Sequence, residues 1–209
     1  MTFSITQEES RAKRGSFSFV LGFFLVSALL MGGWSGEARA HKGHGGPLVT
    51  FVKKKEALRA LLPHGAKILK RKQRLSDTAA EWAEKTYGVD LEQSLYTYYL
   101  ARDRQSGRIV GGAIILKAGY RHGDMVVAVG LDGSGKLTGV GLNGLSEKYI
   151  PEFEGTVGKG LIDGYKGMSV ADMVKKARAA AQGDKPSRVF ASRVRDAAVL
   201  LAAFMNKAK

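Results

Sequence analysis

The chain has 209 residues, of which 33 are Lys or Arg and 19 are Asp or Glu, so its formal net charge is +14. It contains no cysteine, which excludes disulfides, thiol catalysis, c-type haem attachment and iron–sulfur ligation by the chain. A charge of this size favours anionic partners such as lipid headgroups, polyanions or acidic proteins. A basic surface that serves only solubility is the alternative. We expect no nucleic-acid partner, because the chain has no recognisable nucleic-acid motif.

The first forty residues have the pattern of a secretory signal peptide. A basic start at residues 11–14 precedes an apolar run, Phe17–Met31, and Ala38-Arg39-Ala40 is a typical cleavage signal. The run is short for a membrane span, which needs about twenty residues. We therefore predict a cleaved signal peptide at 1–40 and an exported protein, periplasmic or on the extracytoplasmic face of the membrane. An uncleaved N-terminal anchor, which would make the protein membrane-associated, is the alternative.

Residues 41–48 form a His- and Gly-rich stretch that we expect to be flexible, and 49–209 form one domain. The signal segment holds four Lys or Arg and three Glu, so the rest of the chain carries +13. The spacing His41-x-x-His44 with a free amino group could hold a divalent metal weakly. Two side-chain ligands are too few for a closed site, so we predict a solvated tail and no metal site.

The first half of this domain reads as two helices around one strand. Val49–Leu62 has leucines on one side and lysines on the other, as in an amphipathic helix. Lys67–Arg74 is strongly basic and fits an edge strand. Ser76 is a good N-cap for a helix to about Tyr87, which Gly88 ends.

Between residues 94 and 142 the chain reads as four short strands, rich in β-branched or aromatic residues and separated by polar turns. Short polar connections favour hairpins, so we expect an antiparallel meander. The segments are Ser94–Arg102, Arg108–Lys117, Asp124–Leu131 and Leu137–Leu142. The alternative, that one of them is a buried helix segment, is disfavoured by the glycines at 111, 112, 139 and 141.

The last third begins with a long irregular stretch, Asn143–Met168, which is either a functional loop or loosely packed. Ser169 starts a helix to about Gln182, and Ser187 caps a final helix, Ser187–Asn206. The fold class is therefore α+β. We expect a twisted antiparallel sheet of about four to six strands, with helices over one face and around its ends, in a single domain.

Four residues in the first turns of the final helix could bind a phosphate: Ser187, Arg188, Ser192 and Arg193. A helix N-terminus offers N–H groups and partial positive charge, serine can donate a hydrogen bond, and arginine can pair with the anion. The alternative is an ordinary cap beside exposed arginines. No catalytic residue is predicted, because the chain lacks a Ser-His-Asp order, a P-loop or a dinucleotide fingerprint. His64 and His122 lie in turns, where lone histidines are usually surface residues.

Several segments follow one another in an order that resembles the FMN-binding domain of exported flavoproteins. They are Gly119-Tyr120, Val126–Asp132, Gly135–Val140, Ser146-Glu147 and Phe153–Lys159. This domain occurs in the G subunit of Rnf complexes and the C subunit of the sodium-pumping quinone reductase, and the resemblance covers about residues 50–206. Members of the family carry Asp-x-x-Ser-Gly-Ala-Thr before the last helix, and the threonine takes FMN through a phosphoester.

This chain departs from that signature. It reads Asp184-Lys-Pro-Ser-Arg-Val-Phe190, which puts Val189 or Phe190 at the threonine position. Neither side chain has a hydroxyl, so the resemblance implies that any FMN is bound non-covalently.

The resemblance implies an electron-transfer flavoprotein with a membrane-bound or periplasmic redox partner, in which the flavin supplies the redox chemistry. The phosphate would lie near Ser187, Arg188 and Ser192, and the ring near Asn143–Tyr149, where Ser146 and Glu147 lie. The alternative is a flavin-free accessory protein that docks an acidic or membrane partner through its basic surface. An anionic membrane surface is one such partner.

Overall fold

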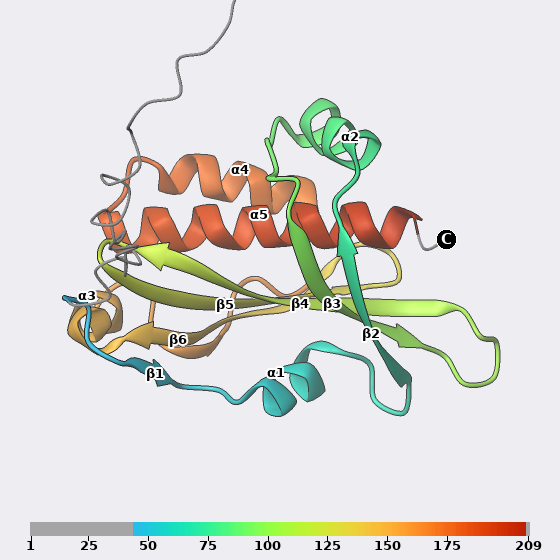
Figure 1. The fold of residues 1–209 in the computed structure, drawn as a ribbon, viewed down its shortest axis with the longest axis horizontal. Helices are drawn as coiled ribbons and strands as arrows, with labels where there is room; N and C mark the ends of the chain where they lie inside the picture. The colour runs from blue at the N-terminus through green and yellow to red at the C-terminus, as the bar shows by residue number, and fades with distance from the viewer. Residues whose placement is uncertain (1–43, 208–209) are drawn as a thin grey trace, which may run out of the picture. The chain divides into compact units, whose positions relative to one another are not determined.

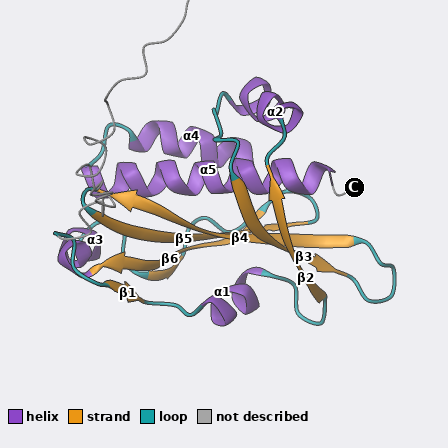
Figure 2. Cartoon of the chain, viewed as in Figure 1, coloured by secondary structure: helices purple, strands orange, loops and turns teal. Residues whose placement is uncertain are grey.

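A computed structural model of the chain describes residues 44–207 (Figure 1). These residues form an antiparallel sheet with helices on both faces, an α+β domain (Figure 2). The strands are β1 (Leu48–Thr50), β2 (Lys67–Arg74), β3 (Leu95–Arg102), β4 (Ile109–Tyr120), β5 (Gly123–Asp132), β6 (Leu137–Ser146) and β7 (Gly160–Ile162). The helices are α1 (Lys54–Leu61), α2 (Asp77–Tyr87), the single 3₁₀ turn η1 (Glu147–Tyr149), α3 (Ile150–Glu154), α4 (Val170–Ala180) and α5 (Lys185–Lys207).

The sheet has the order β1-β6-β5-β4-β3-β2, and β7 pairs with β6. Strands β3 to β6 form the predicted meander, and each pairs with its neighbour in the chain. The basic segment 67–74 is β2 and lies at the edge, as predicted. The described residues contain seven strands, one more than the upper end of the expectation.

Helix α5 covers one face of the sheet, packing on β4 and β5, and α4 and α2 pack against α5. Residues of α5 that recur at helical spacing are buried in this core, as the sequence predicted: Val194, Ala198, Leu201 and Met205. Tyr96 and Tyr98 of β3 point to this face and contact Phe204 of α5.

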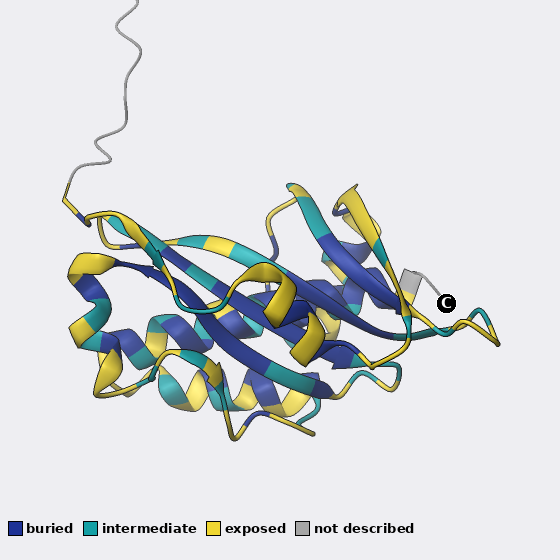
Figure 3. Ribbon diagram, turned by 90° about the horizontal axis from the view of Figure 1, so that it is seen from below, coloured by how far each residue is buried: buried dark blue, intermediate teal, exposed yellow. Residues whose placement is uncertain are grey.

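Helix α1 covers the opposite face, which corrects the prediction that helices lie over one face and the sheet ends (Figure 3). It can approach closely because the strands below it carry small residues. Ala101, Ala113 and Ala128 are fully buried there, beneath Leu58 and Leu61 of the helix. Small side chains at these positions were not recognised as a helix-docking surface in the sequence.

Two regions differ from the expected elements. The predicted helix Val49–Leu62 is a short strand, β1, followed by α1, and Asn143 accepts backbone N–H bonds from Phe51 and Val52 between them. The expected irregular stretch is partly regular: β6 continues to Ser146, and η1, α3 and β7 follow. Asn143 is an extra residue opposite β5, a bulge that hides the strand periodicity.

Helices α2 and α4 begin at the residues that the sequence predicted. The Ser76 side chain accepts the Ala79 N–H at the start of α2, and Gly88 ends that helix in the left-handed conformation. Ser169 accepts the Asp172 N–H at the start of α4. The predicted signal peptide lies outside the described residues. Within 44–207, no helix has both the length and the apolar character to cross a bilayer.

The close approach of α1 generates a stability prediction. A Cβ at Gly130 would overlap Thr138 Oγ1 and lie 2.8 Å from Leu61 Cβ. We expect Gly130→Ala to lower the free energy of unfolding by about 1–3 kcal/mol, the usual range for overpacking. Gly119→Ala is the control, since its Cβ would meet nothing within 4 Å. Urea denaturation of both variants measures the difference, and equal stability would show that α1 does not require this glycine.

Candidate functional site

The six residues predicted to bind FMN lie in three places. Ser146 and Glu147 are at the junction of β6 and η1, Ser187 and Arg188 in the first turn of α5, and the remaining pair, Ser192 and Arg193, further along α5. We describe two hollows formed by the described residues, and of the six predicted residues only Arg193 lines either of them.

Ser146 has a structural contact. Its side chain is buried, and Oγ accepts the Asp124 N–H at 2.9 Å, which ties the end of β6 to the start of β5. A Cβ at Gly123 would lie 2.6 Å from this side chain, so the junction is tightly packed. Glu147 is exposed, and its N–H donates to the Pro47 carbonyl. The predicted ring-binding loop is therefore a strand end followed by a 3₁₀ turn.

The prediction that Ser187 caps the final helix is wrong, because α5 begins at Lys185 and Asp184 caps it. Asp184 Oδ1 accepts the Ser187 N–H at 2.9 Å, and the Asp184 carbonyl accepts the Arg188 N–H at 3.0 Å. Pro186 has no N–H to offer. A carboxylate thus occupies the place at which a phosphate was expected, and the N–H groups of Ser187 and Arg188 are already bonded.

The cap gives a pH-dependent stability. The Ser187 N–H, followed by its hydroxyl, lowers the Asp184 pKa below the ordinary value of 3.8. A depressed pKa contributes stability that is present above the unfolded pKa and lost as pH falls through the folded pKa.

We therefore expect Asp184→Ala to lower the melting temperature at neutral pH. We expect the gap to the parent to close as pH falls from 3.8 through the lowered pKa of Asp184 in the folded protein. Asp163→Ala is the control, because Asp163 is exposed and makes no hydrogen bond or ion pair with the described residues. Thermal melts across this pH range measure the gap. A gap that stays constant would contradict the role of the carboxylate as a cap.

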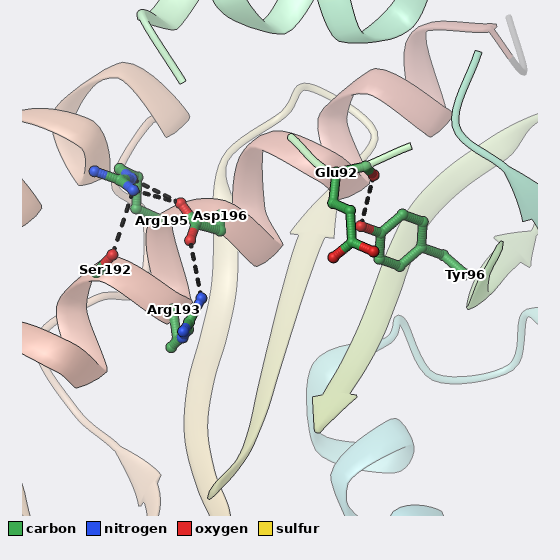
Figure 4. A network of polar contacts seen from close by, with 6 residues as sticks. All are labelled: Glu92, Tyr96, Ser192, Arg193, Arg195 and Asp196. Carbon is green, nitrogen blue, oxygen red and sulfur yellow. Dashed lines mark hydrogen bonds and ion pairs between the residues drawn. The ribbon is translucent and has the colours of Figure 1, made fainter. Parts of the chain in front are cut away.

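Ser192 and Arg193 belong to a polar network on α5 (Figure 4). The Arg195 guanidinium donates to Asp196 at 2.6 and 2.8 Å and to Ser192 Oγ at 3.3 Å. Arg193 Nη1 lies 3.8 Å from the other oxygen of Asp196. Both predicted side chains therefore already have partners within the chain.

The smaller hollow, about 270 Å³, lies between this part of α5 and strands β3 to β5. Two cations line it, Lys117 and Arg193, and each is paired with a carboxylate, Asp124 at 2.8 Å and Asp196 respectively. Three carboxylates also line it: Asp90, Glu92 and Asp196. Burial raises the pKa of Tyr96 in its wall, and Glu92 and Asp196 add to that shift. The excess of negative charge makes this hollow unsuitable for a phosphate.

The larger hollow, about 780 Å³, lies at the other end of the sheet, and we call it the arginine groove. Its residues come from β2, β3, the β3–β4 turn, the start of β4, the β5–β6 turn and the end of α5. They are Leu69, Arg71, Gln73, Tyr98, Leu100, Arg102, Gly107, Arg108, Ile109, Gly133 and Phe204. Three are arginines, and none of the residues is an Asp or Glu.

The three arginines reach the groove from separate segments. Arg71 of β2 lies opposite Tyr98 in the β2–β3 register. Arg102 ends β3, and its Nε donates to the Gly107 carbonyl at 2.6 Å, which fixes the guanidinium at the turn. Arg108 directly precedes β4. None of the three forms an ion pair with any residue from 44 to 207.

The floor of the groove is apolar. The rings of Tyr98 and Phe204 stack with centroids 4.4 Å apart and an angle of 4° between their planes. Burial raises the pKa of Tyr98 and the charge of Arg71 opposes that shift, so the phenol stays protonated at neutral pH. Its hydroxyl donates to Gln73 Oε1 at 3.0 Å. The rings are buried against each other, so what the groove presents is the positive charge of its arginines, which suits an anion.

Basic residues are also frequent in the part of the chain that contains β2. Residues 44–76, which contain α1 and β2, hold nine Lys or Arg and a single acidic residue, Glu56. The sequence showed that β2 is basic, but it did not show that Arg102 and Arg108 join Arg71. The proximity of Arg102 and Arg108 could have been inferred from the predicted hairpin, which brings Arg108 back to the end of β3.

The histidines lie apart from the groove. His44 is exposed, and its ring centroid is 6.5 Å from that of His122, while His41 lies outside the described residues. Residues 44–207 contain no group of three or more His, Asp or Glu that could hold a metal ion.

No protein-family model, curated protein or solved structure matches this chain. The resemblance to FMN-binding domains therefore stays a prediction, and the functional argument depends on the geometry of the chain itself. That geometry brings Arg71, Arg102 and Arg108 together around one groove.

Proposed function

We propose that this protein is a binding protein that docks an anionic partner through the arginine groove and the basic strand β2 that lines it. The observation that carries the proposal is the convergence of Arg71, Arg102 and Arg108 on one groove without a carboxylate in its lining. Guanidinium groups bind carboxylates and phosphates by paired hydrogen bonds, which gives both attraction and geometry. This is the accessory-protein alternative of the two functions inferred from the sequence.

The physical reason is that the three cations repel one another in the free protein. An anion relieves that repulsion and supplies the negative charge with which none of the three guanidinium groups is paired among residues 44–207. Because all three side chains are exposed, the attraction is screened by salt over about 8 Å at physiological ionic strength. Binding should therefore weaken as salt rises.

The groove arginines can be tested directly. We expect the triple variant Arg71→Gln, Arg102→Gln, Arg108→Gln to bind fluorescent polyglutamate at least about tenfold more weakly than the parent, about 1.4 kcal/mol. Fluorescence anisotropy at low and high salt measures the affinity, and circular dichroism checks that the variant is folded.

The control changes the same net charge elsewhere. Lys148, Lys166 and Lys185 are exposed, lie outside the groove, and form no ion pair with the described residues. Their triple change to Gln should weaken binding far less than the groove variant. Equal losses in the two triple variants would mean that net charge, and not the groove, attracts the anion.

Non-covalent FMN is a second candidate for the same groove. What favours it is the set of three guanidinium groups, because FMN carries a phosphate that they can bind. A volume of about 780 Å³ lies within the usual range of ligand sites, about 300–1,000 Å³. In that case the protein would be an electron-transfer flavoprotein, with the flavin away from the positions that the family resemblance indicates.

FMN added to the same variants separates these possibilities. Flavin in the groove would be lost with the Arg71, Arg102, Arg108 variant and retained in Arg188→Gln. The opposite pattern would support the site at the start of α5. All flavin should leave on acid denaturation, since neither Val189 nor Phe190 has a hydroxyl. An absence of FMN binding at micromolar concentration would remove the flavin candidate and leave anion docking.

A further inference from the structure

Strand β2 forms a free edge of the sheet. It is the last strand in the sheet order and pairs with β3 alone through eight consecutive residues. All of its residues except Leu69 are exposed. An edge strand leaves every second set of backbone N–H and C=O groups without a partner, and such a row can pair with another strand.

This edge lacks most of the features that usually prevent pairing. Proteins protect edges with prolines, bulges, very short strands or charged side chains. β2 has eight residues, no proline and an unbroken register with β3, whereas β1 and β7 have three residues each. What protects β2 is charge: Lys67, Lys70, Arg71, Lys72 and Arg74.

Positive charge protects the β2 edge against some pairing strands and not against others. A second copy of β2 would place like charges opposite one another, which is destabilising across strands, so the edge resists self-association. A segment rich in Asp and Glu would instead place opposite charges at the same positions. Pairing of the edge with a second copy of β2 is therefore unfavourable, whereas pairing with an acidic strand is favourable.

We propose that the edge of β2 binds an extended acidic segment of a partner protein, which adds to the sheet as an antiparallel strand. The inference depends on the proposed anion docking and names the partner class for it. Main-chain hydrogen bonds would provide affinity, and the side chains of β2 would select the sequence.

The register defines the segment. Directly opposite residues share a face of the sheet, so carboxylates belong opposite the five cations and apolar side chains opposite Ile68 and Leu69. Ile68 is 45 % exposed, which leaves apolar surface for such a contact. Read antiparallel from Arg74 to Lys67, the matching segment is Glu-Thr-Glu-Glu-Glu-Val-Val-Glu. The carboxylate opposite Arg71 would also lie at the mouth of the arginine groove, which Arg71 lines.

The test compares this peptide with an identical one in which every second amide nitrogen is methylated on the side facing β2. Both carry the same charge, but the methylated peptide cannot form the strand ladder. We expect it to bind the full-length protein at least about tenfold more weakly. We also expect the outward-facing amides of β2, and not those paired with β3, to gain protection from hydrogen exchange when the unmodified peptide binds.

The outcomes separate the two proposals. Equal affinity of the two peptides, with unchanged exchange in β2, would overturn strand addition while anion docking stands. Binding to anionic vesicles with no binding to either peptide would overturn it in favour of a membrane surface. A failure of polyglutamate, both peptides and vesicles to bind at low salt would overturn anion docking as well.

Discussion

The arrangement of this domain follows from one constraint: the sheet is wider than the single long helix that covers it. A six-strand path across the sheet is about 25 Å wide at the usual strand spacing, whereas a helix with its side chains is about 10 Å across. The single long helix α5 covers β4 and β5, and α4 and α2 pack beside α5. Strand β2 lies beyond the strands on which α5 packs, and the arginine groove lies between β2, β3 and the end of α5.

A sheet face that is exposed to solvent needs polar side chains, and here arginines provide them. An arginine stem is aliphatic and can cover apolar side chains while its guanidinium group stays hydrated. The same solution leaves three cations without carboxylates. The same unpaired arginines thus provide both solubility and affinity for anions. Composition alone could therefore not decide between a basic surface that serves solubility and one that binds an anionic partner.

The sequence predicted most of the fold because its signals are local. Hairpin turns, the Ser76 and Ser169 caps, and the period of α5 each depend on neighbouring residues. The predicted start of α5 was wrong because Asp184 and Ser187 are both suitable N-cap residues. Only the hydrogen bond from the Ser187 N–H to the Asp184 carboxylate shows which of them caps the helix. The groove could not be predicted, since it requires Arg71 and Arg102 to meet through the β2–β3 register.

The central claim is that the groove arginines act together on one anion. The most direct measurement is an NMR titration that follows the Nε–H signals of Arg71, Arg102 and Arg108 as polyglutamate is added. The account predicts that these three signals move together and saturate at one affinity, while those of Arg188 and Arg193 stay in place. Small, unsaturated shifts spread over all arginines would contradict it, because they would reveal only general attraction to a basic surface.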